Sequence, residues 1–185
     1  MNVAARRIHS LALVVGAVCL ALGLVSSAQA GFIITIESTE AQADSTDNCF
    51  EVFLSTTDPS DTTLIGGFTI ELMVDPGSGI LFTDASIDTV VKPYLFTGES
   101  STSPGFPFSN GPFPASTVLA SDLYLTFPPG GVAIDEPVSL GRFTYSVAAG
   151  VSGIFRVVLG GRTELVNADG DPLAFQGIDG EIRVS

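Results

Sequence analysis

Apolar and polar side chains alternate with a period of two along much of this 185-residue chain, and this alternation limits its possible folds most strongly. Every second residue from Phe68 to Val74 is apolar, and further along Phe143, Tyr145 and Val147 share one face. Such alternation is typical of strands with one buried face. Further extended segments are 32–37, 50–54, 118–127, 154–159 and 178–184.

Turn-forming residues separate these segments, and no segment carries a sustained apolar stripe of helical period. The turns fall at 58–61, 75–77, 128–131, 160–161 and 169–172. Short strands with one apolar face need a second sheet to bury that face, so the sequence predicts an all-β fold, a two-sheet antiparallel β-sandwich. The predicted core includes Phe68, Ile70, Leu72, Phe143, Tyr145, Ile182 and Val184.

The first 30 residues have the features of an export signal. Arg6 and Arg7 form a positive region, residues 11–25 are apolar, and Ala28-Gln29-Ala30 fits a signal-peptidase site. We therefore expect a Sec-type signal peptide over 1–30 and a single folded domain over 31–185, secreted or held in the cell envelope. An uncleaved membrane anchor is the alternative, but the apolar run is shorter than the roughly 20 residues of a bilayer span.

The residue inventory of 31–185 excludes several kinds of chemistry. The single histidine is His9, and of the two cysteines only Cys49 lies after the leader. A histidine-based catalytic triad, a His/Cys zinc site and an intrachain disulfide are therefore excluded. We expect Lys92, which precedes a proline, to be exposed, and Cys49 to be a buried strand thiol without catalytic function.

The charge of the chain also limits the kinds of partner that it can bind. All 20 acidic residues lie in 31–185 with only five basic ones, which gives this part a net charge of −15. Such a surface repels nucleic-acid phosphates and anionic membranes. Glycoside hydrolysis needs two carboxylates at a set separation, and no pair stands out among these acids. We expect no enzymatic activity and no required cofactor.

Several motifs together resemble the cohesin family. The alternating strand that ends in Asp75-Pro76 is similar to a cohesin strand and turn, and 140–147 is similar to the family's Leu-x-x-Phe-x-Phe-x-Val strand. Segment 94–98 resembles a Tyr-x-Phe-x-Gly element of cohesin-like exported bacterial proteins. The Asp-x-Asp-Gly turn at 167–171 and the terminal strand at 177–184 complete the set. The resemblance implies a jelly roll of about nine strands, shared with carbohydrate-binding modules.

The resemblance also implies two activities, dockerin binding and polysaccharide binding. Carbohydrate-binding relatives stack sugars on planar Trp and Tyr side chains, whereas this chain has no Trp and only Tyr94, Tyr124 and Tyr145. We expect a non-catalytic binding module that recognises an exported, dockerin-like protein through a sheet face. A polysaccharide-binding module is the alternative, and a glycoside hydrolase is a remote one.

Asn167, Asp169 and Asp171 form a candidate calcium site. Their side chains are spaced like the opening of a calcium-binding loop, which supplies oxygen ligands at alternate positions. The remainder departs from that pattern, because Pro172 stands where the loop needs glycine and Ile178 where it needs glutamate. An Asx/Gly turn between two strands is the alternative.

The Pro-, Gly- and Ser-rich segment 98–117 is a candidate partner-binding loop. It carries Phe106, Phe108 and Phe113, and prolines follow the first and the last of them. Exposed aromatic side chains on a stiffened loop are frequent anchors at interfaces. Alternatively, these rings fold back and close one end of the sandwich.

Overall fold

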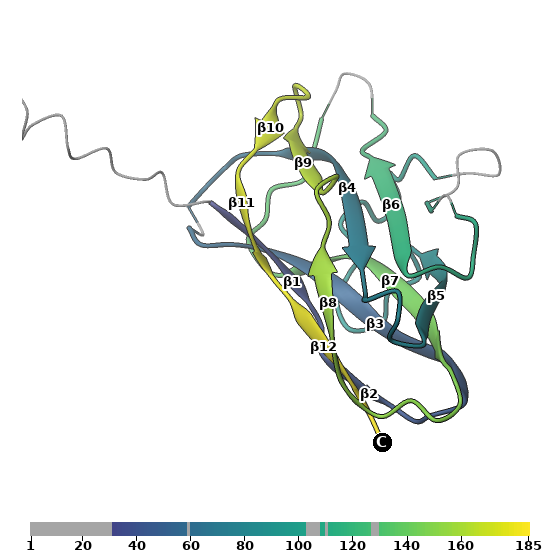
Figure 1. The fold of residues 1–185 in the computed structure, drawn as a ribbon. Helices are drawn as coiled ribbons and strands as arrows, with labels where there is room; N and C mark the ends of the chain where they lie inside the picture. Colours follow the sequence, from purple (N-terminus) through teal and green to yellow (C-terminus); the bar gives the residue numbers. More distant parts are fainter. Residues whose placement is uncertain (1–30, 59, 103–107, 110, 127–129) are drawn as a thin grey trace, which may run out of the picture.

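The computed structural model describes residues 31–58, 60–102, 108–109, 111–126 and 130–185 (Figure 1). The expected signal peptide, residues 1–30, lies outside this range, so its cleavage stays a prediction. Among the described residues, no helix is long and apolar enough to cross a membrane.

Twelve strands make up the regular structure of the described residues. They are β1 (Phe32–Ile36), β2 (Thr39–Ala41), β3 (Ser45–Thr56), β4 (Ile65–Met73), β5 (Ile80–Ser86), β6 (Thr117–Leu123), β7 (Val138–Val147), β8 (Gly153–Leu159), β9 (Glu164–Asn167), β10 (Pro172–Leu173), β11 (Phe175–Ile178) and β12 (Gly180–Val184).

The strands form two sheets that pack face to face (Figure 1). The five-stranded sheet has the order β11–β1–β3–β7–β5. The seven-stranded sheet has the order β10–β9–β4–β8–β12–β2, and β6 pairs with β4. In this second sheet β9 and β8 pair with successive parts of one edge of β4, and β6 pairs with the opposite edge of β4. The predicted all-β sandwich is confirmed.

Two pairings differ from the expected antiparallel arrangement. β1 runs parallel to β11, and β2 runs parallel to β12. The reason is that the first and the last segments of the domain each cross from the five-stranded to the seven-stranded sheet, side by side and in the same direction. β2 and most of β11 lie outside the expected segments 32–37 and 178–184, which is one reason that the strands outnumber the expected nine.

The predicted core residues all lie inside the sandwich. Phe143, Tyr145, Ile70, Leu72 and Ile182 have no exposed surface, and the two remaining members of the predicted set are also buried in the same cluster. The period-two pattern therefore identified the inward faces of β4, β7 and β12 correctly.

Phe108 joins two groups of aromatic rings in this core. Its ring lies 6.2 Å from that of Phe68 and 6.5 Å from that of Phe143, between centroids. Gly141 makes this approach possible: a Cβ atom there would lie 2.6 Å from the Phe108 ring, and its φ of +148° is rarely adopted by other residues. Gly141 also sits at a register shift between β3 and β7, so a bulge admits the ring.

Candidate functional site

The outer face of the seven-stranded sheet carries exposed leucines at the end of β6 and just after it. Val118, Ala120 and Asp122 point inward and are buried, so Leu123 points outward and is 55% exposed. Leu125, two residues further, is 59% exposed. Large apolar side chains that remain exposed together on one face mark interaction surfaces more often than isolated ones do.

Gly67 on β4 allows Leu123 to lie flat on the sheet. Leu123 and Val166 pair with Gly67 from the two neighbouring strands. A Cβ atom on Gly67 would lie 2.5 Å from Leu123 Cδ2 and 3.1 Å from Val166 Cγ2. The leucine therefore extends over the glycine toward the valine. We call Leu123, Leu125 and Val166 the leucine patch.

Three ion pairs lie on the seven-stranded sheet and its adjoining turns. Arg162 binds Glu71 with an Nη2–Oε1 distance of 2.6 Å, and Arg156 binds Asp179 at 2.7 Å. A third pair joins Arg183 to a neighbouring glutamate on β12. Three of the five basic residues of 31–185 thus neutralise acids on this sheet. These pairs lie on β4, β8 and β12 and in the adjoining turns, whereas Glu164, two residues before Val166 on β9, is exposed and belongs to none of the three pairs.

Glu71 is itself an anchor for the turn between β8 and β9. Its carboxylate accepts hydrogen bonds from Arg162 Nε at 2.8 Å and from the Arg162 backbone amide at 3.0 Å. These hydrogen bonds lower the pKa of Glu71 below its ordinary value, against the opposing effect of burial. The pair fixes Arg162 on the face that carries the leucine patch.

The Tyr-x-Phe-x-Gly element connects the core to β6. Phe96 is fully buried, and Tyr94 is 7% exposed. The Tyr94 hydroxyl donates a hydrogen bond to the buried carboxylate of Asp122. Burial, together with the negative charge of Asp122, raises the pKa of Tyr94 far above its ordinary value, so the hydroxyl stays a donor.

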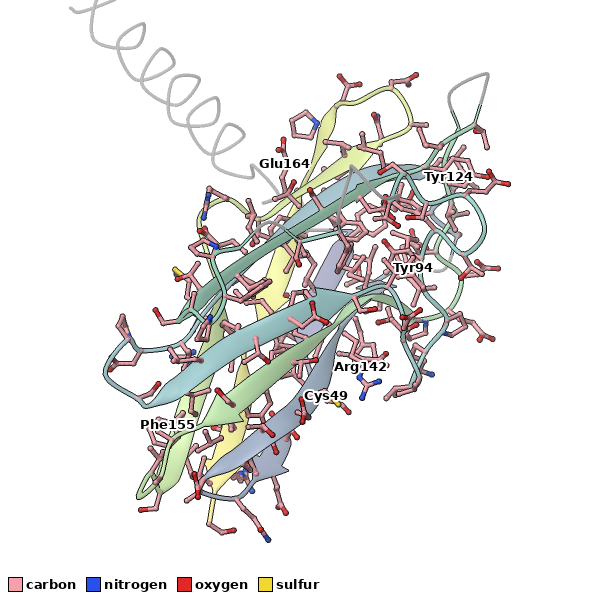
Figure 2. All side chains as sticks on the ribbon, turned by 90° about the vertical axis from the view of Figure 1, so that its right-hand side faces the viewer. Cys49, Tyr94, Tyr124, Arg142, Phe155 and Glu164 are labelled. Carbon is pink, nitrogen blue, oxygen red and sulfur yellow. The ribbon has the colours of Figure 1, made fainter. Side chains whose placement is uncertain are left out.

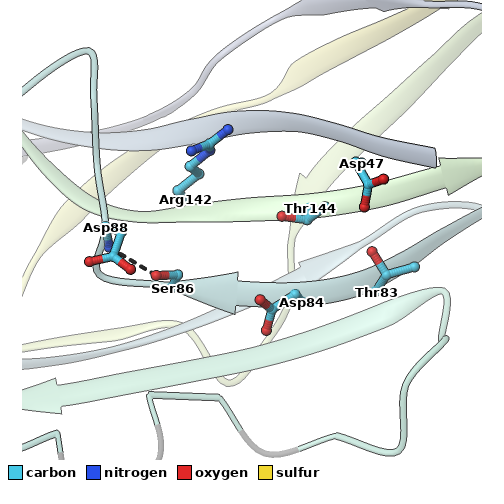
Figure 3. Close-up of a pocket in the computed structure, with 7 residues that line it drawn as sticks. All are labelled: Asp47, Thr83, Asp84, Ser86, Asp88, Arg142 and Thr144. Carbon is cyan, nitrogen blue, oxygen red and sulfur yellow. Dashed lines mark hydrogen bonds between the residues drawn. The ribbon is translucent and has the colours of Figure 1, made fainter.

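The outer face of the five-stranded sheet holds a shallow hollow of about 500 Å³ (Figure 3). It is lined by Asp47, Thr83, Asp84, Ser86, Asp88, Arg142 and Thr144. Figure 3 shows the Arg142 guanidinium directed toward β3, where its Nη2 lies 3.0 Å from Cys49 Sγ. Among the described residues, no group of three or more His, Cys, Asp and Glu side chains is arranged to hold a metal ion.

Cys49 is not buried as expected. It lies half-buried on the outer face of β3, because the alternation of the strand turns Phe50 inward and its neighbours outward. Arg142 is its basic neighbour, and Figure 2 shows the two side chains together. Hydrogen bonding to Cys49 raises the pKa of Arg142. Lys92 is exposed, as expected.

A buried glutamate holds the loop beside the hollow. Glu51, 1% exposed, accepts hydrogen bonds from the backbone amides of Val90 at 2.5 Å, Val91 at 2.9 Å and Lys92 at 3.4 Å. The valine side chains are turned to solvent, 75% and 53% exposed. The acid thus fixes the course of an exposed loop without contributing to a site itself.

The structure brings the three candidate calcium ligands into one turn between β9 and β10. Asn167 Oδ1 already accepts hydrogen bonds from the amides of Asp169 at 2.9 Å and Asp171 at 2.8 Å. Asn167 Nδ2 lies 3.4 Å from Asp171 Oδ2. Both aspartates are exposed. These contacts favour the turn alternative, and calcium binding stays a prediction.

The three candidate partner-binding phenylalanines do not form one exposed cluster among the described residues. Phe108 is 6% exposed and belongs to the core, and Phe113 is half-buried against it. Phe106 lies outside the described residues. The position of Phe108 favours the alternative in which these rings close one end of the sandwich, and their partner-binding role stays a prediction.

The exposed leucines of the outer face and the buried aspartate behind them were not predicted from the sequence. Leu123 and Leu125 continue the outward register of β6, and this register was the signal that could have identified them. Asp122 occupies an inward position in the same strand, where a charged residue indicates a specific hydrogen-bonding role.

No family model and no curated protein matches the sequence. Solved structures do match the fold. The cohesin–dockerin complex Coh-OlpC–Doc435, a type I complex from Clostridium thermocellum, contains a chain with a TM-score of 0.61 at 12% identity, over 87% of this chain and 97% of that chain. CaCohA2 from Clostridium acetobutylicum also has a TM-score of 0.61 at 12% identity, over 84% of this chain and 92% of its own.

A third match comes from an archaeon. A non-cellulosomal cohesin from the hyperthermophile Archaeoglobus fulgidus has a TM-score of 0.54 at 15% identity, over 84% of this chain and 92% of its own. The fold is therefore a cohesin-like jelly roll, which confirms the fold that the sequence motifs implied.

Proposed function

We propose that this protein is a non-catalytic recognition module that binds another protein through the outer face of the seven-stranded sheet. The observation that carries the proposal is the leucine patch, on the outer face of one sheet of a cohesin-like fold. Burying exposed leucine side chains against a partner stabilises a complex.

The matched complexes suggest the kind of partner. Coh-OlpC was solved with the dockerin Doc435, as a type I cohesin–dockerin complex. By analogy, the partner of this chain is a dockerin-like module of an exported protein.

Polysaccharide binding has less support from the described residues. Sugar-stacking modules need aromatic rings exposed in a plane, but Tyr94 and Tyr145 are buried, and Tyr124 is half-buried against Phe96. The hollow on the five-stranded sheet is polar and has no aromatic ring in its lining. A glycoside hydrolase is supported by no arrangement among these residues, and we propose that the protein is not an enzyme.

The export features of the sequence support a location outside the cytoplasm for this recognition. The basic start, the apolar run and the small-residue cleavage site of 1–30 support a secreted or envelope-associated module. Amino-terminal sequencing of the protein recovered from culture medium and from envelope fractions tests both the cleavage after Ala30 and the location.

Surface plasmon resonance against a panel of dockerins, Doc435 among them, tests the recognition. We expect the double variant Leu123→Asp, Leu125→Asp to weaken the binding of any dockerin that the protein binds by at least about tenfold. The matched control is Val90→Asp, Val91→Asp, which adds the same charge to an exposed apolar pair beside the other sheet. Equal loss in both variants, or binding to a glycan array and to no dockerin, contradicts the proposal.

A further inference from the structure

Asp122 is a buried carboxylate directly behind the leucine patch, and all of its hydrogen bonds are internal. It is 2% exposed. Its Oδ1 accepts hydrogen bonds from Ser101 N at 2.8 Å, Ser101 Oγ at 2.6 Å and Leu123 N at 2.8 Å. Its Oδ2 accepts from Tyr94 Oη and Ser100 Oγ, both at 2.5 Å. A carboxylate has about four lone-pair sites, so five donors satisfy it completely.

These hydrogen bonds fasten segment 99–101 along the edge of β6 that faces away from β4. Ser101 N donates to Leu123 O at 3.0 Å, and Leu125 N donates to Glu99 O at 2.8 Å. Leu123 N also lies 3.2 Å from Ser101 Oγ. The segment therefore contacts the backbone of the two exposed leucines.

β4 holds the same stretch from the other side. Leu123 pairs with Gly67, and Tyr124 N donates to Gly66 O at 3.0 Å. The backbone of residues 123–125 is thus fixed on both edges, although two of its three side chains are exposed. Fixing a binding element before the partner arrives lowers the entropy lost on association.

We propose that Asp122 is a positioning residue of the docking face, which holds Leu123 and Leu125 in the arrangement that binds the partner. It acts through segment 99–101 and touches no partner itself. The expected effect of Asp122 on partner binding rests on the proposed recognition function. The positioning of the leucines is a property of the protein without a partner.

Two substitutions of Asp122 separate its hydrogen bonds from its charge. In Asp122→Asn, the amide oxygen still accepts from the Ser101 and Leu123 amides, and the NH₂ group donates to the hydroxyl oxygens of Tyr94 and Ser100, which accept as well as donate. The Asn variant can therefore keep the segment in place. Asp122→Ala leaves both backbone amides without the carboxylate and releases it.

Amide hydrogen exchange tests the positioning without any partner. We expect the Ser101 and Leu125 amides of Asp122→Ala to exchange faster than in the wild type by about tenfold or more, and those of Asp122→Asn to stay near the wild type. The control is Glu51→Ala, which removes an equally buried carboxylate but releases the loop at Val90. It should leave the Ser101 and Leu125 amides protected. Unchanged protection of these two amides in Asp122→Ala overturns the proposal.

Association kinetics with a dockerin that the wild type binds test the consequence. If only a fraction of Asp122→Ala molecules present the leucines correctly, the association rate constant falls to that fraction of the wild-type value and the dissociation rate constant stays the same. An unchanged association rate constant, with faster exchange, also overturns the proposal. If the wild type binds no dockerin, the recognition function fails, and hydrogen exchange alone decides whether Asp122 positions the leucines.

Discussion

Arg162 donates three hydrogen bonds to the carboxylate of Glu71. Its Nη2 and Nε lie 2.6 Å and 2.8 Å from Oε1, and its backbone amide lies 3.0 Å from Oε2. The side chain of Arg162 is 62% exposed, whereas that of Glu71 is 10% exposed. The glutamate is therefore the structural member of the pair, since it connects β4 to the turn that follows β8.

This pair predicts a loss of stability in acid. The folded state lowers the pKa of Glu71 below its ordinary value of 4.5, so the stability it contributes is fully present above 4.5 and is lost as the pH falls through the lower folded value. We expect the melting temperature of Glu71→Gln to lie below that of the wild type at neutral pH, and the gap to narrow below pH 4.5. Calorimetric melts across this range measure it. Glu164→Gln, at an exposed position, is the control and should follow the wild type.

Phe143→Ala should destabilise the domain strongly. Phe143 has no exposed surface and stacks on Phe50 with ring centroids 5.9 Å apart. Truncating a buried phenylalanine to alanine costs about 3–5 kcal/mol in the free energy of unfolding. Leu125→Ala, on the exposed patch, should change it by less than about 0.5 kcal/mol. Urea titrations give both values, and a small loss for Phe143→Ala would contradict the placement of this side chain in the core.

Phe108→Ala distinguishes closure of the sandwich from partner binding. The ring contacts Phe68, Tyr94 and Phe143. We therefore expect a loss of about 3–5 kcal/mol in the free energy of unfolding. Phe113→Ala, at a half-buried position, should cost less. If Phe108→Ala instead leaves the unfolding curve unchanged and abolishes binding of a dockerin, the ring belongs to an interface.

Calcium should not be needed for the turn at Asn167. Its Oδ1 accepts two backbone hydrogen bonds, so Asn167→Ala should lower stability by about 1 kcal/mol, with or without the ion. We expect millimolar calcium to leave the melting temperature of the wild type unchanged. A rise that disappears in Asp169→Ala would establish the calcium site instead.

The sequence predicted the sandwich because its main signal is local. Alternation along a strand assigns each residue to a face without knowledge of its neighbours, and the inward faces of β4 and β7 followed directly. The parallel pairs β1–β11 and β2–β12 join the two ends of the domain. No local pattern specifies which distant segments lie side by side, so these pairs were not predicted.

The candidate sites were harder to predict, because they depend on contacts between distant residues. Asp122 and Tyr94 are 28 residues apart, and Glu51 and Val90 are 39 apart. Composition alone does not show which of the 20 acidic residues are buried and which are exposed. The alternation of β6 marks Asp122 as an inward-facing acid, unlike most of the others. Its role follows only from its hydrogen bonds to segment 99–101, which the sequence does not reveal.

Buried carboxylates hold three loop or turn segments of this domain in place by hydrogen bonds. Glu51 holds the loop at 90–92, Glu71 the turn at 160–162, and Asp122 the segment 99–101, while Cys49 is the single cysteine of 31–185. Small exported domains commonly secure such segments with disulfides, whose formation needs an oxidant and whose persistence needs an oxidising surrounding. A chain tied by carboxylates completes its fold without a thiol oxidase. Its fold therefore does not depend on the redox state of its surroundings.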